Sequence, residues 1–455
     1  MLQNKTTILI LAAGKGRRMN SNYPKVLHKL GGKTILEYVL KTAKSINPKK
    51  VILVCTKNIK KILSKTQNFS VEWVIQIHPK GTGDAITIAS KNFSDNENVL
   101  VLYGDMPFIS KESIKKLQES KKKSHLSLLT SNIKNPEGYG RVLRKNGKVI
   151  GIVEDKCAKH KEKLIKEVYS GTFIANGKDL KRWILKIKQN KINQELYATD
   201  IVYLAYLEGC TILTVKPENY NEILGINNQL QLSILEKIIQ KKITKNLMIS
   251  GIMLKDPSHF QLRGTLKHGK NIEIDTGVIL EGNVTLGNNI TIGVGCIIKN
   301  SIIQNQSKIK AYSIIENVKI GENCIIGPFC HLRNNTILNN EIHVGNFVEI
   351  KTSTIEKKTK IKHLSYIGDA EIGSNVNIGA GTITCNYDGL KKSKTIIGNN
   401  AFIGSNSELI APIKISKDTT IAAGTTVIKN VEKSCLVYNK KEQKHKENWI
   451  LTKKK

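Results

Sequence analysis

Residues 314–350 read IIENVKIGENCIIGPFCHLRNNTILNNEIHVGNFVEI, and an aliphatic residue returns every six positions along this stretch. Glycine often follows the aliphatic residue, as at Gly321 and Gly345. One inward aliphatic side chain per six residues, with Gly or Asn at the corners, is typical of a parallel β-helix built from short stacked strands. The aliphatic positions of this stretch are Ile314, Ile320, Ile326, Leu332, Leu338, Val344 and Ile350.

The same period extends in both directions and persists for roughly 150 residues, where a chance pattern would lose phase within a few repeats. The segment 384–394 (TCNYDGLKKSK) interrupts it and is predicted to be a loop thrown out from one coil. The remaining inward positions are predicted at Ile274, Leu280, Leu286, Ile292, Ile298, Ile361, Ile367, Ile372, Ile378, Ile397, Ile403, Leu409, Ile415, Ile421 and Val427.

Residues 1 to about 228 follow a different pattern, in which short apolar runs alternate with amphipathic stretches. Helices are expected over 35–45 and 111–120. This alternation predicts an α/β, Rossmann-like domain with a mostly parallel sheet, whose ligands lie beyond the carboxyl ends of the strands. The strands, each expected to be buried on both faces, are predicted at 7–12, 51–55, 71–76, 99–103 and 126–130.

A long amphipathic stretch without Gly or Pro, Gln229–Ile249, separates the two patterns. It predicts one joining helix that stops at Gly251. The expected organisation is therefore a nucleotidyltransferase-like domain over 1–228, a linker helix over 229–250 and a β-helix domain over 251–455.

The formal net charge is +35, which raises the question of a nucleic-acid partner. Only seven of the 72 basic residues are arginine, the side chain most used for bidentate phosphate and base contacts. The lysines are scattered and accompany many Ile and Asn residues, so drift toward A/T-rich codons accounts for the charge. No basic motif with interleaved aromatics is present, and no nucleic-acid partner is expected.

The eight cysteines show no CxxC spacing, which predicts reduced thiols in a cytoplasmic protein without a structural zinc site. No apolar run approaches the ~18 residues that span a bilayer. Residues 6–13 run straight into Gly14-Lys15-Gly16-Arg17-Arg18, so a buried first strand is expected there and not a signal core.

The loop after the first strand, 11–19, reads LAAGKGRRM. Small residues after a strand allow backbone N–H groups to approach a phosphate closely, and Arg18 and Lys25 supply cations. The loop matches neither the dinucleotide fingerprint nor the Walker loop, and a structural tight turn remains an alternative. Asp105 follows another strand and is suited either to hold Mg²⁺ or to cap a helix.

Five segments together carry a resemblance that covers essentially the whole chain: LAAGKGRRM with Lys25, GTGDA at 81–85, LYGDMP at 102–107, GYGR at 138–141 and the six-residue repeats. The chain closely resembles the bacterial bifunctional N-acetylglucosamine-1-phosphate uridylyltransferase/glucosamine-1-phosphate acetyltransferases. The resemblance implies a left-handed β-helix, assembly as a homotrimer with acetyl-transfer sites between subunits, and the synthesis of UDP-N-acetylglucosamine for peptidoglycan and lipopolysaccharide.

For the N-terminal half, the resemblance implies transfer of uridylyl from UTP to N-acetylglucosamine 1-phosphate with release of pyrophosphate, with Arg18 in a catalytic role. Mg²⁺ would be held by Asp105 and Asn227. The implied nucleotide contacts are Leu11, Ala12, Ala13, Gly14, Lys25, Gln76, Gly81 and Thr82, and the implied UDP-sugar contacts are Tyr103, Gly104, Gly140, Glu154, Tyr169 and Asn227.

For the C-terminal half, His363 suits the base that acetyl transfer to an amine requires, because histidine is the side-chain type most used as a general base, although a lone histidine is more often a packing residue. The resemblance implies the same role for His363. It further implies glucosamine 1-phosphate contacts at Arg333, Lys351, Tyr366 and Asn377, and acetyl-CoA contacts at Ala380, Asn386, Tyr387, Ser405, Ala423 and Lys440.

Three positions depart from the family's pattern. Arg17 replaces a usual Thr and adds a cation beside the phosphates, while Tyr169 replaces a usual Asn and puts that sugar contact in doubt. Lys440 replaces a usual Arg and loses its planar fork.

Two other functions are alternatives: a single-activity sugar nucleotidylyltransferase whose β-helix only assembles the oligomer, and a basic nucleic-acid-binding scaffold. The polar residues gathered around the 384–394 loop favour the bifunctional hypothesis over the first.

Overall fold

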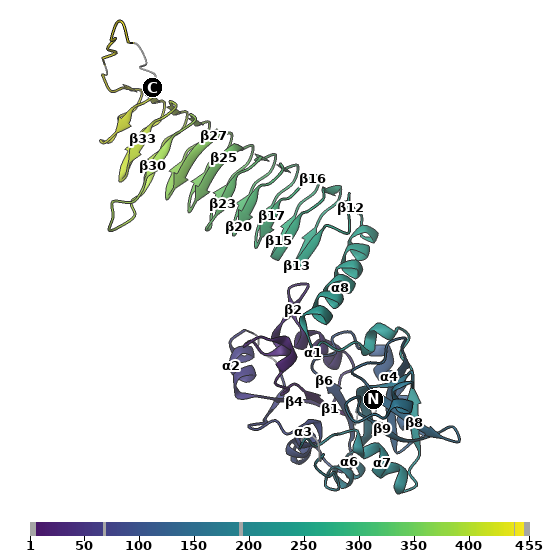
Figure 1. Ribbon diagram of the computed structural model, residues 1–455. Coiled ribbons are helices and arrows are strands. Elements are labelled where there is room, and N and C mark those ends of the chain that lie inside the picture. The colour runs from purple at the N-terminus through teal and green to yellow at the C-terminus, as the bar shows by residue number, and fades with distance from the viewer. Residues whose placement is uncertain (1–5, 67–69, 191–193, 441, 450–455) are drawn as a thin grey trace, which may run out of the picture. The chain divides into compact units, whose positions relative to one another are not determined.

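The computed structural model describes residues 6–66, 70–190, 194–440 and 442–449. The chain forms two compact units, Met1–Lys237 and Ile238–Lys455. The predicted helix over 229–249 is present as α8 (Gln229–Ile249), and Gly251, with φ of 97°, follows its end (Figure 1).

The first unit is built on a nine-stranded sheet in the order β11-β7-β10-β6-β1-β4-β5, with β8 and β9 attached through β10. The pairs β1–β4, β1–β6, β4–β5 and β7–β11 are parallel, whereas β10 runs antiparallel to β6 and β7. The strands are β1 (Thr6–Leu11), β4 (Lys50–Cys55), β5 (Glu72–Ile75), β6 (Asn98–Tyr103), β7 (Leu126–Asn132), β8 (Gly140–Lys145), β9 (Lys148–Val153), β10 (Glu167–Asn176) and β11 (Ile212–Val215).

The five strands expected from the apolar runs are all present, and the mostly parallel α/β fold is confirmed. The expectation of burial on both faces is wrong for β5, where only Val74 is buried. β5 lies at the edge of the sheet, so one side of it has no neighbouring strand.

Helices pack on both faces of this sheet. Apolar residues of α3 (Thr82–Ala89), α6 (Gly177–Ile184) and α7 (Asp200–Leu207) share one core, and residues of α1 (Ile35–Ser45), α2 (Lys57–Thr66) and α4 (Lys111–Lys121) share the other. Ser110 caps α4 by accepting a hydrogen bond from Ser113 N at 3.0 Å, so Asp105 is not a helix cap. Thr34 and Glu37 form a capping box on α1.

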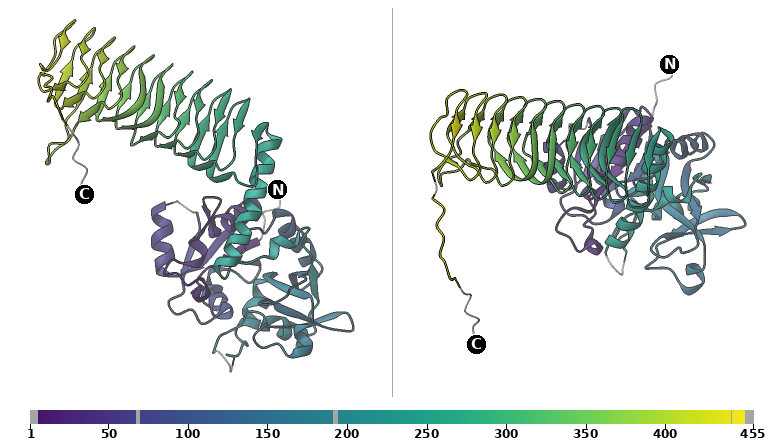
Figure 2. Two further views of the ribbon diagram at one scale, coloured as in Figure 1. Left: turned by 45° about the horizontal axis from the view of Figure 1, so that its top comes forward. Right: turned by 90° about the horizontal axis from the view of Figure 1, so that it is seen from above.

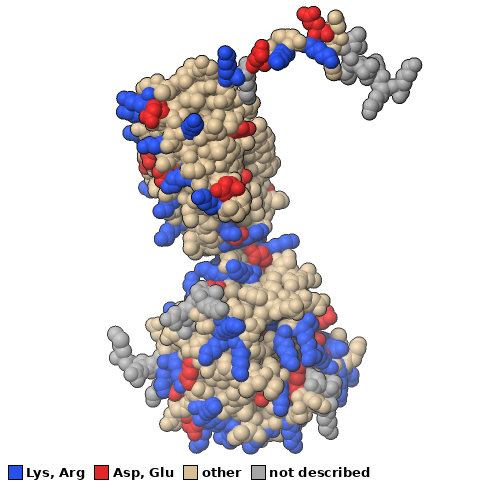
Figure 3. Space-filling view, turned by 90° about the vertical axis from the view of Figure 1, so that its left-hand side faces the viewer, with Lys and Arg blue, Asp and Glu red and all other residues tan. Residues whose placement is uncertain are grey.

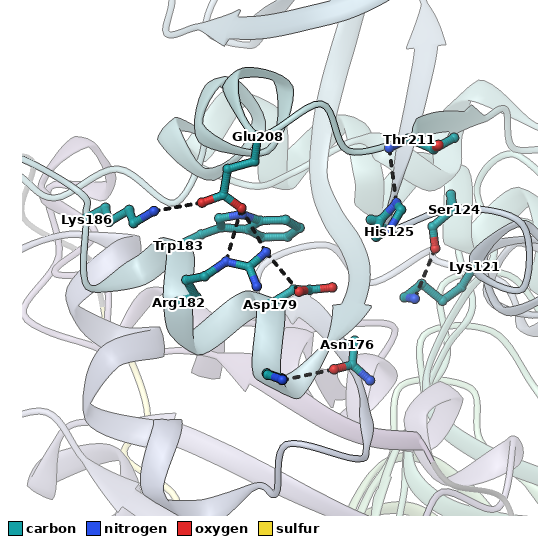
Figure 4. A network of polar contacts seen from close by, with 11 residues as sticks. Lys121, Ser124, His125, Asn176, Asp179, Arg182, Trp183, Lys186, Glu208 and Thr211 are labelled. Carbon is teal, nitrogen blue, oxygen red and sulfur yellow. Dashed lines mark hydrogen bonds and ion pairs between the residues drawn. The ribbon is translucent and has the colours of Figure 1, made fainter.

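A polar network ties α6 to the end of α7 (Figure 4). The Glu208 carboxylate accepts hydrogen bonds from Arg182, from Trp183 Nε1 at 2.9 Å and from Lys186 at 2.8 Å. These donors hold the pKa of Glu208 at about 2, below its ordinary value. Because Trp183 is fully buried, this network also satisfies the indole N–H at the edge of the core.

The second unit is a stack of short parallel strands, from β12 (Ile252–Leu254) to β37 (Leu436–Val437), as expected of a parallel β-helix (Figures 1 and 2). Inward aliphatic residues form one continuous core along it. The longest strands are β13 (Gln261–His268), β15 (Ile279–Leu286), β25 (His343–Lys351) and β27 (Lys360–Gly368), each of which continues from one face to the next.

Two details of the repeat differ from expectation. Ile314 is 37% exposed, and its neighbour Ile315 is the inward residue. Two isoleucines are adjacent at this coil. The buried residues that precede it are Ile298, Ile303 and Ile309, so the spacing is five residues once, between Ile298 and Ile303, and six residues thereafter up to Ile315. The loop also begins later than predicted, because Thr384 occupies an inward position and accepts a hydrogen bond from Gly368 N at 2.7 Å.

Basic side chains are spread over both units with acidic side chains among them on the face shown in Figure 3. In the described part of the chain, no helix has the length and apolar character that a membrane span requires. All eight cysteines are free thiols.

Candidate functional site

The first unit contains a cavity of about 470 Å³ at the carboxyl ends of β1 and β6. The strand ends are held together there, since Gly104 N donates to Leu11 O at 2.9 Å and Ala12 N donates to Val54 O at 2.8 Å. A Cβ at position 104 would lie 3.0 Å from the Ala12 Cβ, so a larger residue would force the two strand ends apart by a few tenths of an ångström. Predicted residues that line the cavity are Leu11, Ala12, Ala13, Gly14, Lys25, Gln76, Gly81, Thr82, Tyr103, Asp105 and Glu154.

Gln76 shows how the fold prepares one wall of this cavity. Its side chain is buried, and its amide Nε2 donates to Asp84 Oδ2 at 2.5 Å. This bond fixes the amide plane. Gly81 begins α3 with φ of 112° against the backbone of Leu196, and Thr82 Oγ1 accepts from Ala198 N at 3.0 Å. The wall therefore presents ordered polar groups of the kind that recognise a base edge.

The cationic and acidic groups meet at Lys25. Its ammonium forms an ion pair with Asp105 and donates to Asn227 Oδ1 at 3.2 Å. The two predicted metal ligands thus converge on one positively charged atom. Asn227 is itself positioned by its backbone N–H, which donates to Gln231 Oε1 at 2.7 Å.

Glu154 is a partly buried carboxylate that also lines the cavity. Thr199 Oγ1 donates to Glu154 Oε1 at 2.9 Å, while burial raises the pKa of Glu154 above its ordinary value. A side chain on Gly140 would come within 3.9 Å of Glu154 Oε2, so Gly140 lies directly behind this carboxylate.

Five predicted residues are not part of the cavity lining: Arg18, Gly104, Gly140, Tyr169 and Asn227. Tyr169 is buried and its hydroxyl donates to Gly171 O at 2.7 Å, so this hydroxyl is engaged within the protein. Arg18 is exposed on η1 (Arg17–Met19), and it is the neighbouring Arg17 that lines the cavity.

Sequence reasoning missed several lining residues. Lys156, Glu195 and Tyr197 come from segments without a recognisable motif and reach the cavity only through the fold. Lys15 also lines the cavity. It belongs to the 11–19 loop, and its place in that loop is the sequence signal that could have identified it.

In the second unit, His363 lies on β27 beside Asn346 of β25, with 2.9 Å between His363 Nδ1 and Asn346 Oδ1. When Nδ1–H donates to this amide oxygen, the lone pair of the ring is on Nε2. Asn346 was not predicted, although it lies 17 residues before His363, which is the length of one coil.

Three predicted phosphate and sugar contacts gather on one face. Arg333 and Lys351 lie opposite each other in neighbouring coils, as do Glu349 and Tyr366. The Glu349 carboxylate accepts hydrogen bonds from Arg333 Nε at 2.9 Å and Nη2 at 2.5 Å. Gly368 leaves the space into which the Tyr366 hydroxyl and the Asn386 amide project, because a side chain there would lie 2.6 and 2.7 Å from them.

The 384–394 loop adds a cation that the sequence did not reveal. Lys392 lies against Lys351, and the neighbouring ammonium lowers the pKa of Lys392 below its ordinary value. Two adjacent ammonium groups favour an anionic ligand between them. No sequence pattern pointed to Lys392, because the 384–394 loop departs from the six-residue repeat.

Asn377 stands apart from this group. In the β-ladder, Asn377 is the neighbour of Lys360 and Phe402, in the column that also contains His343. This column lies before the corner at His363, whereas Arg333, Lys351 and Tyr366 lie in columns after that corner. One chain therefore presents these four residues on two different faces.

The predicted acetyl-CoA contacts form a third feature. Asn406 N donates to Ala380 O at 2.7 Å and Gly424 N donates to Ser405 O at 2.8 Å, so Ala380, Ser405 and Ala423 recur at one corner of successive coils. All three have small side chains, and on the 384–394 loop Asn386 is buried while Tyr387 is exposed. Lys440 is exposed, and its neighbour Asn439 accepts a hydrogen bond from Thr426 N at 2.6 Å.

The fold and the two clusters define a transferase with a nucleotide-binding α/β domain and a hexapeptide-repeat domain. A model of the MobA-like NTP transferase domain matches residues 8–141, one of the GMPPB C-terminal domain matches 263–355, and one of the hexapeptide repeat of succinyl-transferase matches 394–429.

Similar proteins with full-length matches carry the name bifunctional protein GlmU. That of Buchnera aphidicola subsp. Acyrthosiphon pisum (strain APS) is 63% identical over 100% of this chain and 99% of its own. Those of subsp. Schizaphis graminum and subsp. Baizongia pistaciae are 66% and 54% identical, over 99% and 98% of this chain and 97% and 100% of theirs. The chain belongs to the bifunctional GlmU family, and it is an enzyme with a nucleotidyltransferase domain and a hexapeptide-repeat acetyltransferase domain.

Proposed function

We propose that the chain makes UDP-N-acetylglucosamine in two steps, each in one domain. The β-helix domain (251–455) acetylates glucosamine 1-phosphate with acetyl-CoA, and the α/β domain (1–228) then transfers uridylyl from UTP to the product. Residues 229–250 join them. The observation that carries this proposal is the coexistence of the Lys25–Asp105–Asn227 cluster and the His363–Asn346 pair in one chain.

In the uridylyl step, an oxygen of the sugar 1-phosphate attacks the α-phosphorus of UTP, a new P–O bond forms, and pyrophosphate leaves. Such transfer depends on positioning and charge neutralisation and requires no covalent nucleophile. Lys25 and Arg17 reach the cavity, Arg18 lies on the same short helix, and Gln76 and Thr82 hold the base side.

The residues present fit Mg²⁺. Asp105 and Asn227 offer a carboxylate and an amide oxygen, which converge on one cation, and hard oxygen ligands of this kind bind Mg²⁺ together with phosphates. Among the described residues no group of three or more His, Cys, Asp and Glu gathers, so water and phosphate oxygens would complete the coordination. When bound, Mg²⁺ would neutralise charge on the phosphates, and Lys25 would then be free to contact the nucleotide.

In the acetyl step, the amine nitrogen attacks the thioester carbonyl, the C–N bond forms, and the C–S bond breaks. His363 Nε2 takes the amine proton while Asn346 holds the ring. Arg333, Lys351 and Lys392 supply positive charge for the sugar phosphate, and the small residues Ala380, Ser405 and Ala423 contact the CoA arm.

A homotrimer in the cytoplasm is part of this proposal. The separation of Asn377 from Arg333 and Tyr366 onto two faces supports sites completed by a neighbouring subunit. The free cysteines suit a reducing compartment.

The test is mass spectrometry on the purified chain with glucosamine 1-phosphate, acetyl-CoA, UTP and Mg²⁺. The proposal requires UDP-N-acetylglucosamine, and loss of that product when any one reactant is withheld. If product forms only from N-acetylglucosamine 1-phosphate, the β-helix carries no acetyl transfer and the single-activity alternative holds.

A further inference from the structure

The helix α8 begins two residues after Asn227, one of the two proposed metal ligands. Asn228 caps this helix, because its side-chain Oδ1 accepts a hydrogen bond from Gln231 N at 2.8 Å. In a capping box, the side chain of the third helical residue returns a bond to the backbone N–H of the cap. Here Gln231 Oε1 reaches one residue further back and accepts from Asn227 N at 2.7 Å. The start of α8 is therefore tied directly to the proposed metal ligand.

The backbone that carries Asn227 depends on individual hydrogen bonds, since residues 224–227 lie outside any helix or strand. On one side of Asn227, Ile226 N donates to Asp105 O at 3.1 Å, and the Ile226 side chain is fully buried. On the other side lies the bond to Gln231. Asn227 is thus held between the second proposed metal ligand and α8, and its side-chain Oδ1 accepts from Lys25 at 3.2 Å, on the same ammonium that pairs with Asp105.

The beginning of α8 is anchored to the first unit at two further points. Gln229 Nε2 donates to Met19 O at 3.2 Å, at the end of η1. Further along the helix, Glu236 Oε2 accepts from Gly31 N at 2.9 Å. These contacts lie on either side of Gln231 in the sequence. A helix fixed in this way holds the Gln231 side chain at a constant position relative to the 224–227 segment.

We propose that Gln231 is a positioning residue for the uridylyl step. It fixes the backbone of Asn227 so that the side-chain oxygen meets the metal together with the Asp105 carboxylate. The inference rests on the proposed function, in which these two residues hold Mg²⁺.

The chemistry of the metal explains why such a contact matters. Mg²⁺ demands near-octahedral geometry at short distances, so it tolerates a displaced oxygen ligand poorly. Hydrogen-bonding groups behind a metal ligand typically change metal affinity or activity by roughly 10- to 100-fold when they are removed. A residue that only capped α8 would change the stability of the chain and leave metal affinity unaltered.

The test compares two changes at position 231. Gln231→Leu removes the acceptor at similar size, and Gln231→Glu keeps an acceptor oxygen at the end of the side chain. Gln240→Leu is the matched control, because Gln240 is another α8 glutamine that bonds backbone groups. It accepts from Leu262 N at 3.1 Å and donates to Leu262 O at 3.0 Å.

Each full-length variant is titrated with Mn²⁺, a spectroscopic substitute for Mg²⁺, in the presence of UDP-N-acetylglucosamine. Electron paramagnetic resonance measures the free metal. The Mg²⁺ dependence of pyrophosphate release, the rate of acetyl transfer and the thermal unfolding midpoint are measured on the same samples.

Gln231→Leu is expected to raise the Mn²⁺ dissociation constant by about tenfold, and the Mg²⁺ concentration for half-maximal pyrophosphate release by a similar factor. Its kcat at saturating Mg²⁺ and its acetyl transfer should stay close to those of the parent. Gln231→Glu should bind Mn²⁺ at least as tightly as the parent. Gln240→Leu should match the parent in metal binding, whatever its unfolding midpoint.

Two results would overturn the proposal while leaving the proposed function intact. One is a Gln231→Leu variant that loses thermal stability but binds Mn²⁺ like the parent, which would reduce Gln231 to a helix cap. The other is a Gln231→Glu variant that binds Mn²⁺ as weakly as Gln231→Leu. A parent chain that binds no Mn²⁺ would instead remove the metal site of the proposed function, and this inference with it.

Discussion

Asn346 provides a quantitative test of how the acetyl-transfer site works. Asn346→Ala removes the acceptor 2.9 Å from His363 Nδ1 and leaves the imidazole itself in place. A neutral hydrogen bond contributes about 0.5–1.5 kcal/mol net, which corresponds to roughly a 2- to 13-fold change in rate at 25 °C. Because both side chains are partly or fully exposed in the single chain, water can replace the amide, and the lower half of that range is expected.

The assay follows CoA release with a thiol reagent at saturating acetyl-CoA and glucosamine 1-phosphate. Pyrophosphate release by the same preparation gives an internal control, since the α/β domain contains neither residue. His363→Ala, which removes the base, should lower acetyl transfer by about 10²–10⁴-fold. If Asn346→Ala matched the parent, or fell as far as His363→Ala, the positioning role of Asn346 would be refuted.

Three further changes test other parts of the molecule. Gly81→Ala would place a Cβ 2.4 Å from Leu196 O at φ of 112°. It should destabilise the first unit by about 2–3 kcal/mol in a thermal unfolding experiment and raise KM for UTP. The control is Gly151→Ala, whose Cβ would meet nothing closer than 3.8 Å. Glu208→Gln should lower stability by about 1 kcal/mol near neutral pH. The pKa of Glu208 is held at about 2, so its contribution to stability is present above the ordinary pKa of a glutamate and is lost as the pH falls toward 2. The unfolding midpoints of variant and parent should therefore converge near pH 2. A difference between the midpoints that stays constant with pH would contradict this role. Lys392→Ala should raise KM for glucosamine 1-phosphate by about tenfold through loss of a charge-assisted contact, with Lys391→Ala as the neighbouring control; equal effects would argue against a specific role for Lys392.

The sequence predicted the β-helix because one aliphatic residue per coil suffices to define the period. It failed at Ile314 because two adjacent isoleucines satisfy the same pattern, and only the coil spacing decides that Ile315 faces inward. No strand was predicted over 167–176, where β10 forms, and its antiparallel direction carries no sequence signal because a buried strand has the same composition in either direction.

The candidate sites were predicted where residues lie within recognisable motifs, such as 11–14 and 102–107. Residues that reach a site through loop conformation carried no such signal, as with Lys156 and Lys392. The position of Tyr169, with its hydroxyl bound to Gly171 O, also depended on the packing of β10 and could not be deduced from the substitution alone.

The central claim is that one chain carries two independent active sites. The most direct measurement assays acetyl transfer and pyrophosphate release separately in His363→Ala and Asp105→Ala, and then the coupled reaction in an equal mixture of the two. Each variant should lose one activity and keep the other within about twofold, and the mixture should regain UDP-N-acetylglucosamine synthesis because the intermediate diffuses between chains. Loss of both activities in either folded variant, or failure of the mixture to form product, would contradict the claim.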